Sequence, residues 1–590
     1  MGFGPTRLLL PATLRRHEAL WVLPVGAAAT SLELALLAYG FVPFDIALGI
    51  VLAGGVALAV FAWRRDRGLI AHSARADAAS WRELAVPLVL AALIAAIALL
   101  PMFRGGFETV IGNGSDAHLA VGTAEFLQSN HPTGADPGAA VDRVPLVWRS
   151  KPPIYLSFGA VARVAGMAPY AVIATLSAAL LAFAALGFWL LARELLRAGP
   201  WAAGAAMGLV GMNRIELFTG MHPYFNQTWG YMATPFSIVL AWHVVRHRTR
   251  GGVMLFAAFI GIVAFAYPLA LPIPLLAAII FAAFERRRRG LSLLRLPRLR
   301  SKRQLLWIVP LFIMLIKPLQ GVLEKTAAST RVLTPGYSLV NWGGDLTQFF
   351  PERYFLGIDD ATGAIVAIPL FAIGLFIALR RSPRDIRWGL GAIVAFGVLA
   401  ALFFRPRDYG WYFHFKALAF VGPLVVTAAA VGLARLRWRW VGAVALLLLI
   451  GVTRNGAAHE VGQTFDQLPK SMLELRTLDA GLPPDDSIRL DIPADGRMLW
   501  VGNTLAGQPL CSQRPVLNTS YPHVPISRAA DYVLVDKDWR KPFDAVGPPV
   551  RDLERYILYR LRPELPGGDR CSRKMVLTVK KLYAGGKDVE

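Results

Sequence analysis

The sequence is poor in acidic residues and lacks two patterns that are typical of other protein classes. Its 590 residues include 39 Asp and Glu against 62 Lys and Arg, which gives a formal net charge of +23 at pH 7. No glycine-rich dinucleotide-binding signature stands out, which argues against soluble nucleotide-sugar chemistry. No clear internal repeat is present either, which argues against a transporter built from inverted halves.

Apolar residues, in contrast, are abundant. They make up 55% of the chain, and the mean hydropathy is +0.47. A soluble domain of this composition would expose too much apolar surface, so the sequence predicts a polytopic membrane protein. The basic excess then follows from arginines in cytoplasmic loops, and nucleic acid is not expected as a partner. The basic stretch at 285–303 is expected to meet anionic membrane lipids.

Thirteen apolar segments reach or approach the length of a membrane-spanning helix. With the N-terminus in the cytoplasm, every arginine cluster between these segments falls on the cytoplasmic side, which places the C-terminus outside the plasma (inner) membrane. The pair at 252–284 could instead be one broken span, which would reverse the orientation of everything after it. The expected spans lie near 19–40, 44–63, 83–102, 169–192, 200–217, 228–246, 252–268, 270–284, 305–322, 363–380, 388–404, 415–434 and 439–453.

The composition becomes polar after about residue 453. Strand-like pieces at 487–492, 531–536, 556–561 and 575–582, with a helix-like piece at 496–507, predict a small extracytoplasmic α/β domain over 454–590. The predicted fold class is thus a mainly α membrane protein, with about 13 transmembrane helices over 1–453 and this domain after them. The only two cysteines, Cys511 and Cys571, lie in the domain, where the compartment permits a disulfide. Two buried free thiols are the alternative.

Two long outer loops, 103–168 and 323–362, are expected to bind or react, as long loops in compact proteins usually do. In the first loop, Ser115 or Asp116 is placed to cap a helix that runs to about Gln128 and lies along the membrane surface. Capping is also the simplest role for Asp116. The expected apolar face of this helix comprises Ala117, Ala120, Ala124 and Leu127.

The first outer loop contains a series of motifs in a fixed order. Asp116 is followed about one helix later by Ala124 and Leu127, and then come Lys151, Pro152, Pro153, Ile154, Tyr155 and Gly166. This order resembles the GT-C class of membrane glycosyltransferases over about 103–168, and it is similar to the protein O-mannosyltransferase, aminoarabinose transferase and arabinofuranosyltransferase branches. The resemblance implies a polyprenyl-phosphate sugar donor, an acceptor outside the cytoplasm (a cell-wall glycan, lipid or protein), and Asp116 as the catalytic base.

The sequence departs from this pattern at His118, where many relatives have a second acid. An Asp-x-His pair can ligate a divalent cation such as Mg, Mn or Ca, but one pair is an incomplete coordination shell. Metal dependence therefore stays open. A polar side chain at the membrane interface is the alternative role for His118.

Glycosyl transfer also needs cations that stabilise the departing phosphate. Arginine can grip a phosphate in a fork, and lysine acts as a point charge. Anchoring in lipid headgroups is the alternative for each cation. Glu216 is a candidate second acid, unless it only forms a local ion pair with Arg214. The expected substrate-binding residues are His118, Lys151, Tyr155, Glu216, Lys317, Lys325, Arg331, Arg405, Arg407 and Lys416.

The sequence leaves three functions to compare. The leading interpretation is a membrane glycosyltransferase. A transporter or flippase of a lipid-linked saccharide would need polar residues deep in several spans, and few are present. A non-enzymatic polymer-assembly protein would leave Asp116 replaceable.

Overall fold

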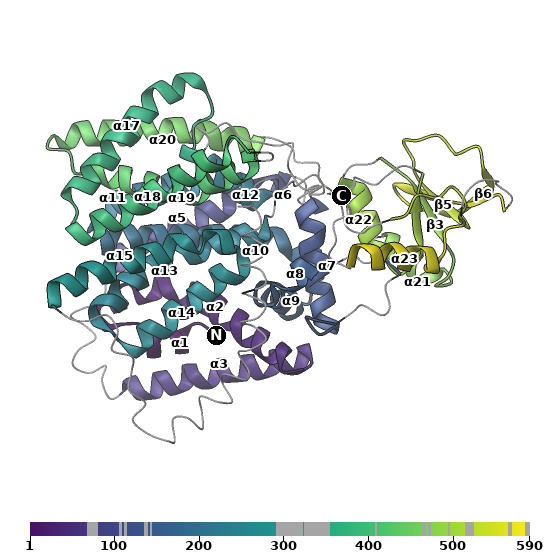
Figure 1. The fold of residues 1–590 in the computed structure, drawn as a ribbon, viewed down its shortest axis with the longest axis horizontal. Helices are drawn as coiled ribbons and strands as arrows, with labels where there is room; N and C mark the ends of the chain where they lie inside the picture. Colours follow the sequence, from purple (N-terminus) through teal and green to yellow (C-terminus); the bar gives the residue numbers. More distant parts are fainter. Residues whose placement is uncertain are drawn as a thin grey trace.

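The computed structural model shows a bundle of long helices with a small sheet domain at one end (Figure 1). The chain is mainly helical, which confirms the predicted class of a mainly α membrane protein with a small α/β part. The structure describes residues 1–67, 81–104, 109–110, 115–134, 140–141, 144, 146–222, 224–290, 323, 355–407, 410–462, 468–469, 474–493, 496–513, 524–563 and 569–584.

Within these described ranges, eight helices are long and apolar enough to cross a membrane, and two shorter apolar helices accompany them. The number of thirteen spans stays a prediction, and its segment at 305–322 lies outside the described residues. The long helices of the bundle include these eight together with α5, α13 and α14. They are α2 (Glu18–Tyr39), α3 (Phe44–Arg67), α5 (Trp81–Ala98), α10 (Pro169–Leu190), α13 (Phe225–His247), α14 (Arg250–Ala266), α15 (Pro272–Arg289), α17 (Ala361–Arg381), α18 (Arg384–Phe404), α19 (Gly410–Ala434) and α20 (Arg439–Gly462).

Shorter elements fill the gaps between the long helices and build one end of the bundle. Two of them, β1 and β2, pair antiparallel and join the first loop to the segment after α20. The shorter elements are α1 (Phe3–Leu9), η1 (Ala12–His17), α6 (Leu100–Arg104), β1 (Thr109–Val110), α7 (Ser115–Ser129), α8 (Leu146–Arg149), α9 (Pro152–Ala165), η2 (Leu191–Leu195), α11 (Pro200–Gly211), α12 (Arg214–Met221), η3 (Pro268–Ala270) and β2 (Leu468–Pro469).

Helix α13 lies in the core of the bundle. It packs against α10, α14 and α15, and it is buried from Phe225 to His243. Its first turn nevertheless contains Asn226, Gln227 and Thr228. A buried amide costs free energy unless it is hydrogen-bonded, so this turn requires polar partners from neighbouring segments.

The expected single span at 200–217 is wrong. Helix α11 ends at Gly211, and the Asn213 side chain then accepts a hydrogen bond from the Ile215 backbone N–H at 2.9 Å, which caps the separate helix α12. The segment 252–284 forms two helices, α14 and α15, with the short η3 turn between them. Pro268 and Pro272 lack the N–H that a continuous helix would need here.

The sheet domain comprises the described residues from 474 to 584. Its five strands have the order β4-β3-β5-β7-β6, in which β3 is parallel to β4 and β5, and β7 is antiparallel to β5 and β6. Cys511 and Cys571 form a disulfide that joins β4 to the start of α23. The elements are α21 (Leu475–Gly481), β3 (Ile488–Asp491), α22 (Gly496–Thr504), β4 (Leu510–Ser512), β5 (Tyr532–Asp536), β6 (Ala545–Asp552), β7 (Tyr556–Leu561) and α23 (Arg573–Ala584).

The expected strand at 575–582 is also wrong, because this segment forms α23. Its β-branched residues favour a strand locally. However, Val576, Val579 and Tyr583 recur at spacings of three and four, which is a helical period. Val576 is fully buried, so packing of one helical face decides the conformation.

Helix α7 lies between the bundle and the sheet domain (Figure 1). The expected surface helix is covered on both sides, because α9 and α10 pack on one side and α22 packs on the other. The Trp500 ring of α22 meets the buried His118 ring edge-on, with 6.2 Å between ring centroids. The face toward the bundle is buried as expected and comprises Ala117, Ala120, Ala124 and Leu127.

Two further contacts fix the sheet domain on α7. A Cβ atom at Gly122 would lie 2.7 Å from the Asn503 Oδ1 atom, so the missing side chain permits a close approach of α22. The Arg476 guanidinium of α21 pairs with the Glu125 carboxylate at 2.6 Å. The position of the first turn of α7, which contains Asp116, therefore depends on the docked sheet domain.

Truncating Trp500 should loosen this docking, because it leaves a cavity over His118. We expect Trp500→Ala to lower the free energy of unfolding by about 3–5 kcal/mol and to speed amide hydrogen exchange in α7. Trp539→Ala is the matched control, since Trp539 lies in the same domain and is 43% exposed. Equal exchange of α7 in the wild type and in Trp500→Ala would contradict this role of the sheet domain.

Candidate functional site

Asp116 lies in the first turn of α7 and is half-buried. The segment that faces it begins at Lys151, directly before α9. Pro152 and Pro153 occupy the first positions of α9, where a missing backbone N–H costs nothing and the fixed φ suits a helix. Gly166 ends the helix with a φ of +65°, a conformation that suits glycine. The proline pair thus places Lys151 and Tyr155 on the side of α9 that α7 covers.

The charge of Asp116 acts on both of these residues. Removal from water lowers the pKa of the Lys151 ammonium to about 8, and the Asp116 carboxylate opposes this shift. Burial is also the main reason why the pKa of Tyr155 is raised well above its usual value, and the Asp116 charge adds to that rise. The Tyr155 hydroxyl donates a hydrogen bond to Asn226 Oδ1 at 2.5 Å. Asp116, Lys151, Tyr155 and Asn226 therefore form one polar cluster, which we call the acid cluster.

A second buried cation lies on α19. Lys416 is 4% exposed, and its Nζ atom donates a hydrogen bond to Gln227 Oε1. The Nζ atom also lies 4.5 Å from the centroid of the Tyr224 ring, a distance at which the ring face attracts a cation. The Lys416 ammonium is thus held against α13 by an amide oxygen and an aromatic ring.

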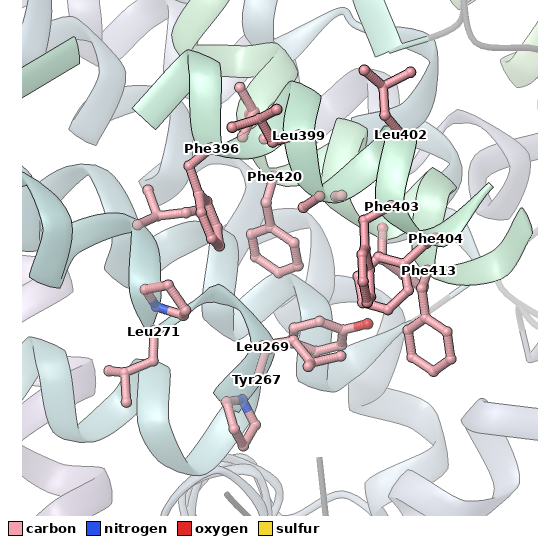
Figure 2. Close-up of a pocket in the computed structure, with 18 of the residues that line it drawn as sticks. Tyr267, Leu269, Leu271, Phe396, Leu399, Leu402, Phe403, Phe404, Phe413 and Phe420 are labelled. Atoms are coloured by element: carbon pink, nitrogen blue, oxygen red, sulfur yellow. The ribbon is translucent and has the colours of Figure 1, made fainter. Parts of the chain in front are cut away.

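Lys416 lines a large apolar cavity of about 1010 Å³ between η3, α15, α18 and α19. Figure 2 shows aromatic rings around it, among them Phe396, Phe403, Phe413 and Phe420. The cavity opens on the outside of the bundle, because its lining includes exposed residues such as Leu399, which is 66% exposed. The lining on α18 extends from 396 to 404, a depth of about 12 Å along the helix.

Two more of the predicted cations adjoin residues that line this cavity. Arg407 stacks on the Phe403 ring, with 3.8 Å from its Cζ atom to the ring centroid, and Phe403 lines the cavity. Arg405 follows the lining residue Phe404 and donates to His414 Nε2 at 3.3 Å. His414 Nδ1 in turn donates to the Ala401 carbonyl at 2.8 Å, which leaves Nε2 as an acceptor. We call Lys416, Arg405 and Arg407 the cation group.

The start of α13 connects this cation group to the acid cluster. Asn226 accepts the hydrogen bond from Tyr155, and the next residue, Gln227, accepts the one from Lys416. Successive helical residues point about 100° apart, so one helical turn can contact both groups. These two amides were not found from the sequence. The signal was present in "YFNQTWGY", which opens an apolar span with adjacent amide side chains.

The remaining predicted residues lie elsewhere. His118 is covered by Trp500, because a residue two positions after Asp116 points to the opposite side of α7. Glu216 is buried beside the Tyr231 hydroxyl. The alternative of a Glu216–Arg214 ion pair is wrong, because Arg214 pairs with Glu460 and Asp359. Three predicted cations lie outside the described residues, namely Lys317, Lys325 and Arg331.

The described residues of the acid cluster supply one carboxylate, which is an incomplete coordination shell for a divalent cation. Across the described residues, no three His, Cys, Asp or Glu side chains come together in a way that could hold a metal ion. The Asp116 charge instead acts on the Lys151 ammonium. A metal is therefore not part of the proposed function.

No protein-family model and no curated protein matches the chain. Three similar solved structures are GT-C glycosyltransferases, the class that the loop motifs resemble. The oligosaccharyltransferase of Archaeoglobus fulgidus has 14% identity and a TM-score of 0.45, and the match covers 78% of this chain and 70% of that one. Arabinofuranosyltransferase AftD from Mycobacteria has 13% identity and a TM-score of 0.46, with 82% and 42% covered, so the chain spans less than half of that protein.

The third structure is ArnT from Cupriavidus metallidurans bound to undecaprenyl phosphate. It has 12% identity and a TM-score of 0.43, and the match covers 82% of this chain and 99% of that one. Identities and TM-scores this low do not establish a function.

The coupling between Asp116 and Lys151 can be measured directly. In Asp116→Asn, the loss of the carboxylate charge should lower the pKa of Lys151 below its value of about 8, because that charge favours the ammonium. The measurement is the pH dependence of Lys151 modification by an amine-selective reagent, followed by peptide mass spectrometry. Asp116→Glu, which keeps the charge, is the control. An unchanged Lys151 titration in Asp116→Asn would refute the acid cluster.

Proposed function

We propose that the protein is an integral-membrane glycosyltransferase that moves a sugar from a polyprenyl-phosphate donor to an acceptor hydroxyl outside the cytoplasm. One observation carries this proposal. An apolar cavity that opens on the outside of the bundle is lined by the buried cation Lys416, and α13 connects that cation to the cluster around Asp116. A ligand that fits both parts has a long apolar tail and an anionic head.

The polyprenyl-phosphate donor matches this arrangement part by part. Its isoprenoid tail would lie along the aromatic and aliphatic lining and leave through the exposed side near Leu399. Its phosphate would lie at Lys416, with Arg405 and Arg407 beside the neighbouring residues Phe403 and His414. Cations held in a water-poor site stabilise a developing phosphate charge more strongly than they would in water. The sugar would then extend toward the acid cluster.

The proposed step needs a base and a leaving group on opposite sides of the sugar. The acceptor oxygen forms a bond to the anomeric carbon, and the bond from that carbon to the phosphate oxygen breaks. The phosphate leaves with the electron pair toward the cation group. The acceptor proton passes to the Asp116 carboxylate, whose charge acts on Lys151 and Tyr155 beside it. The acceptor would be a hydroxyl of a cell-wall glycan, a lipid or a protein.

This function requires the α7 end of the bundle to lie outside the cytoplasm. The arginine clusters support this orientation, because they meet at the opposite ends of the helices. Arg289 donates a hydrogen bond to the Arg246 carbonyl at 2.5 Å, and Arg381 donates to the Arg435 carbonyl. We therefore propose a cytoplasmic N-terminus in the plasma (inner) membrane, a membrane domain over 1–453 and an extracytoplasmic domain over 454–590.

The proposal is tested by incubating the purified protein in liposomes with a panel of radiolabelled polyprenyl-phosphate sugars and candidate acceptors. Transfer of label to an acceptor would support it. Movement of the labelled lipid between leaflets without transfer would instead support a flippase. Neither transfer nor movement, with a folded protein, would favour the polymer-assembly alternative.

Asp116→Asn separates the role of a base from that of a helix cap. Asparagine caps helices about as well as aspartate, so loss of a cap should not unfold the protein, and loss of the charge beside Lys151 adds a separate cost. It cannot accept the acceptor proton, so the turnover rate should fall by about 10²–10⁴-fold while binding of the donor changes much less. Both are measured on the folded protein, by transfer of label and by donor binding. Transfer at the wild-type rate would remove Asp116 from the chemistry.

Filling the cavity should affect long donors more than short ones. Ala400 lines the cavity on α18, and Ala400→Phe would place a ring where the lipid tail is expected. We expect donor affinity to fall by about tenfold for a full-length polyprenyl chain and to change little for a donor with two isoprene units, because overpacking removes room only for the longer tail. The control is Val444→Phe on α20, because Val444 is exposed on the outside of the bundle and does not line the cavity. An equal loss for both chain lengths would contradict the tail site.

A further inference from the structure

The amide of Gln227 contacts both the Tyr231 hydroxyl and the Lys416 ammonium, and the chemistry of these partners shows which group donates. The Tyr231 hydroxyl donates to the Ala419 carbonyl at 3.0 Å, and a carbonyl can only accept. The Tyr231 oxygen must then accept from Gln227 Nε2, which lies 2.9 Å away. Because the amide nitrogen is used there, the amide oxygen faces Lys416, and the ammonium donates to it.

These hydrogen bonds form a network that joins helices α13 and α19. Gln227 and Tyr231 lie one turn apart on α13, and Lys416 and Ala419 lie one turn apart on α19. Gln227 and Tyr231 are each 1% exposed, so the network is shielded from water. A charge-assisted hydrogen bond in such surroundings fixes the geometry of its donor more strongly than one in water does.

Gln227 does not line the cavity, whereas Lys416 does. Among the described hydrogen bonds of Gln227, the one from Lys416 joins it directly to a residue that lines the cavity. We propose that Gln227 is a positioning residue that holds the Lys416 ammonium at the cavity wall, where it binds the phosphate of the lipid. This inference rests on the proposed function for the identity of that lipid.

The choice of glutamine at this position has a consequence for charge. A neutral amide oxygen orients the ammonium without adding a negative charge beside it. A carboxylate at the same place would hold the ammonium equally well but would add a negative charge at the cavity wall, and it could not donate to Tyr231 when ionised. Glutamine is therefore the side chain that holds Lys416 without adding repulsion toward a phosphate.

The test compares Gln227→Glu with Gln227→Leu and uses undecaprenyl phosphate as the probe. Binding is measured on protein whose folding is checked by thermal unfolding. Gln227→Glu should weaken binding by about ten- to a hundredfold, which corresponds to losing a hydrogen bond from a charged group. Gln227→Leu leaves the charge of Lys416 unchanged but removes the hydrogen bond that holds its ammonium. It should therefore weaken binding less, by about three- to tenfold. In the transfer assay, both should raise the donor KM more than they lower kcat.

The control and the coupling experiment separate positioning from packing. Thr228→Val changes the next residue of α13, whose hydroxyl bonds only to the Tyr224 carbonyl among its described hydrogen bonds, and should leave binding unchanged. In a Lys416→Met background, Gln227→Glu should add no further loss, because the group through which it acts is gone. Unchanged binding in folded Gln227→Glu, or an additive loss in the double variant, would overturn the inference.

Failure of this inference differs from failure of the proposed function. A wild-type protein that binds undecaprenyl phosphate but transfers no sugar would reject the transferase function, and the binding data would still decide the role of Gln227. A wild-type protein that binds no undecaprenyl phosphate would reject both. A wild-type protein that binds and transfers, with unaffected Gln227 variants, would reject the positioning role alone.

Discussion

The cost of removing charged groups from water at one end of the bundle is the constraint on which this structure depends. A buried ammonium is tolerated only when polar or charged groups replace its hydration shell. Lys151, which is half-buried, and Lys416, which is buried, meet this requirement in different ways. Lys151 has the charge of Asp116 near it, whereas Lys416 is held by the neutral amide of Gln227. The first arrangement places a carboxylate beside a cation, and the second orients a cation without adding a negative charge.

The same constraint explains why α13 has amides in its first turn. An apolar turn would pack well but would leave Tyr155 and Lys416 without their hydrogen-bond partners. Docking of the sheet domain adds a second requirement, because it buries α7 on the side away from the bundle and leaves Asp116 half-buried at the end of that helix. The acid, the cations and the cavity are therefore held by contacts between segments far apart in the sequence.

Local patterns in the sequence predicted the parts of this arrangement that depend on composition and on near neighbours. The apolar runs predicted the long helices, and the capping residues Ser115 and Asp116 predicted the start of α7. The break at Asn213 was missed, because one capping side chain outweighed a continuous apolar run. The helix at 573–584 was missed because tertiary packing outweighed β-branched composition. Asn226 and Gln227 were missed since their roles depend on partners about 70 and 190 positions away.

The central claim is that a lipid-linked donor lies in the cavity between α15, α18 and α19 with its head toward Lys416. The most direct measurement is photo-crosslinking with an undecaprenyl-phosphate sugar analogue that has a diazirine in its tail, followed by peptide mass spectrometry. The account predicts adducts on lining residues such as Leu275, Leu399 and Leu402. Adducts confined to other lipid-facing surfaces, such as that of α3 around Val56, would contradict it.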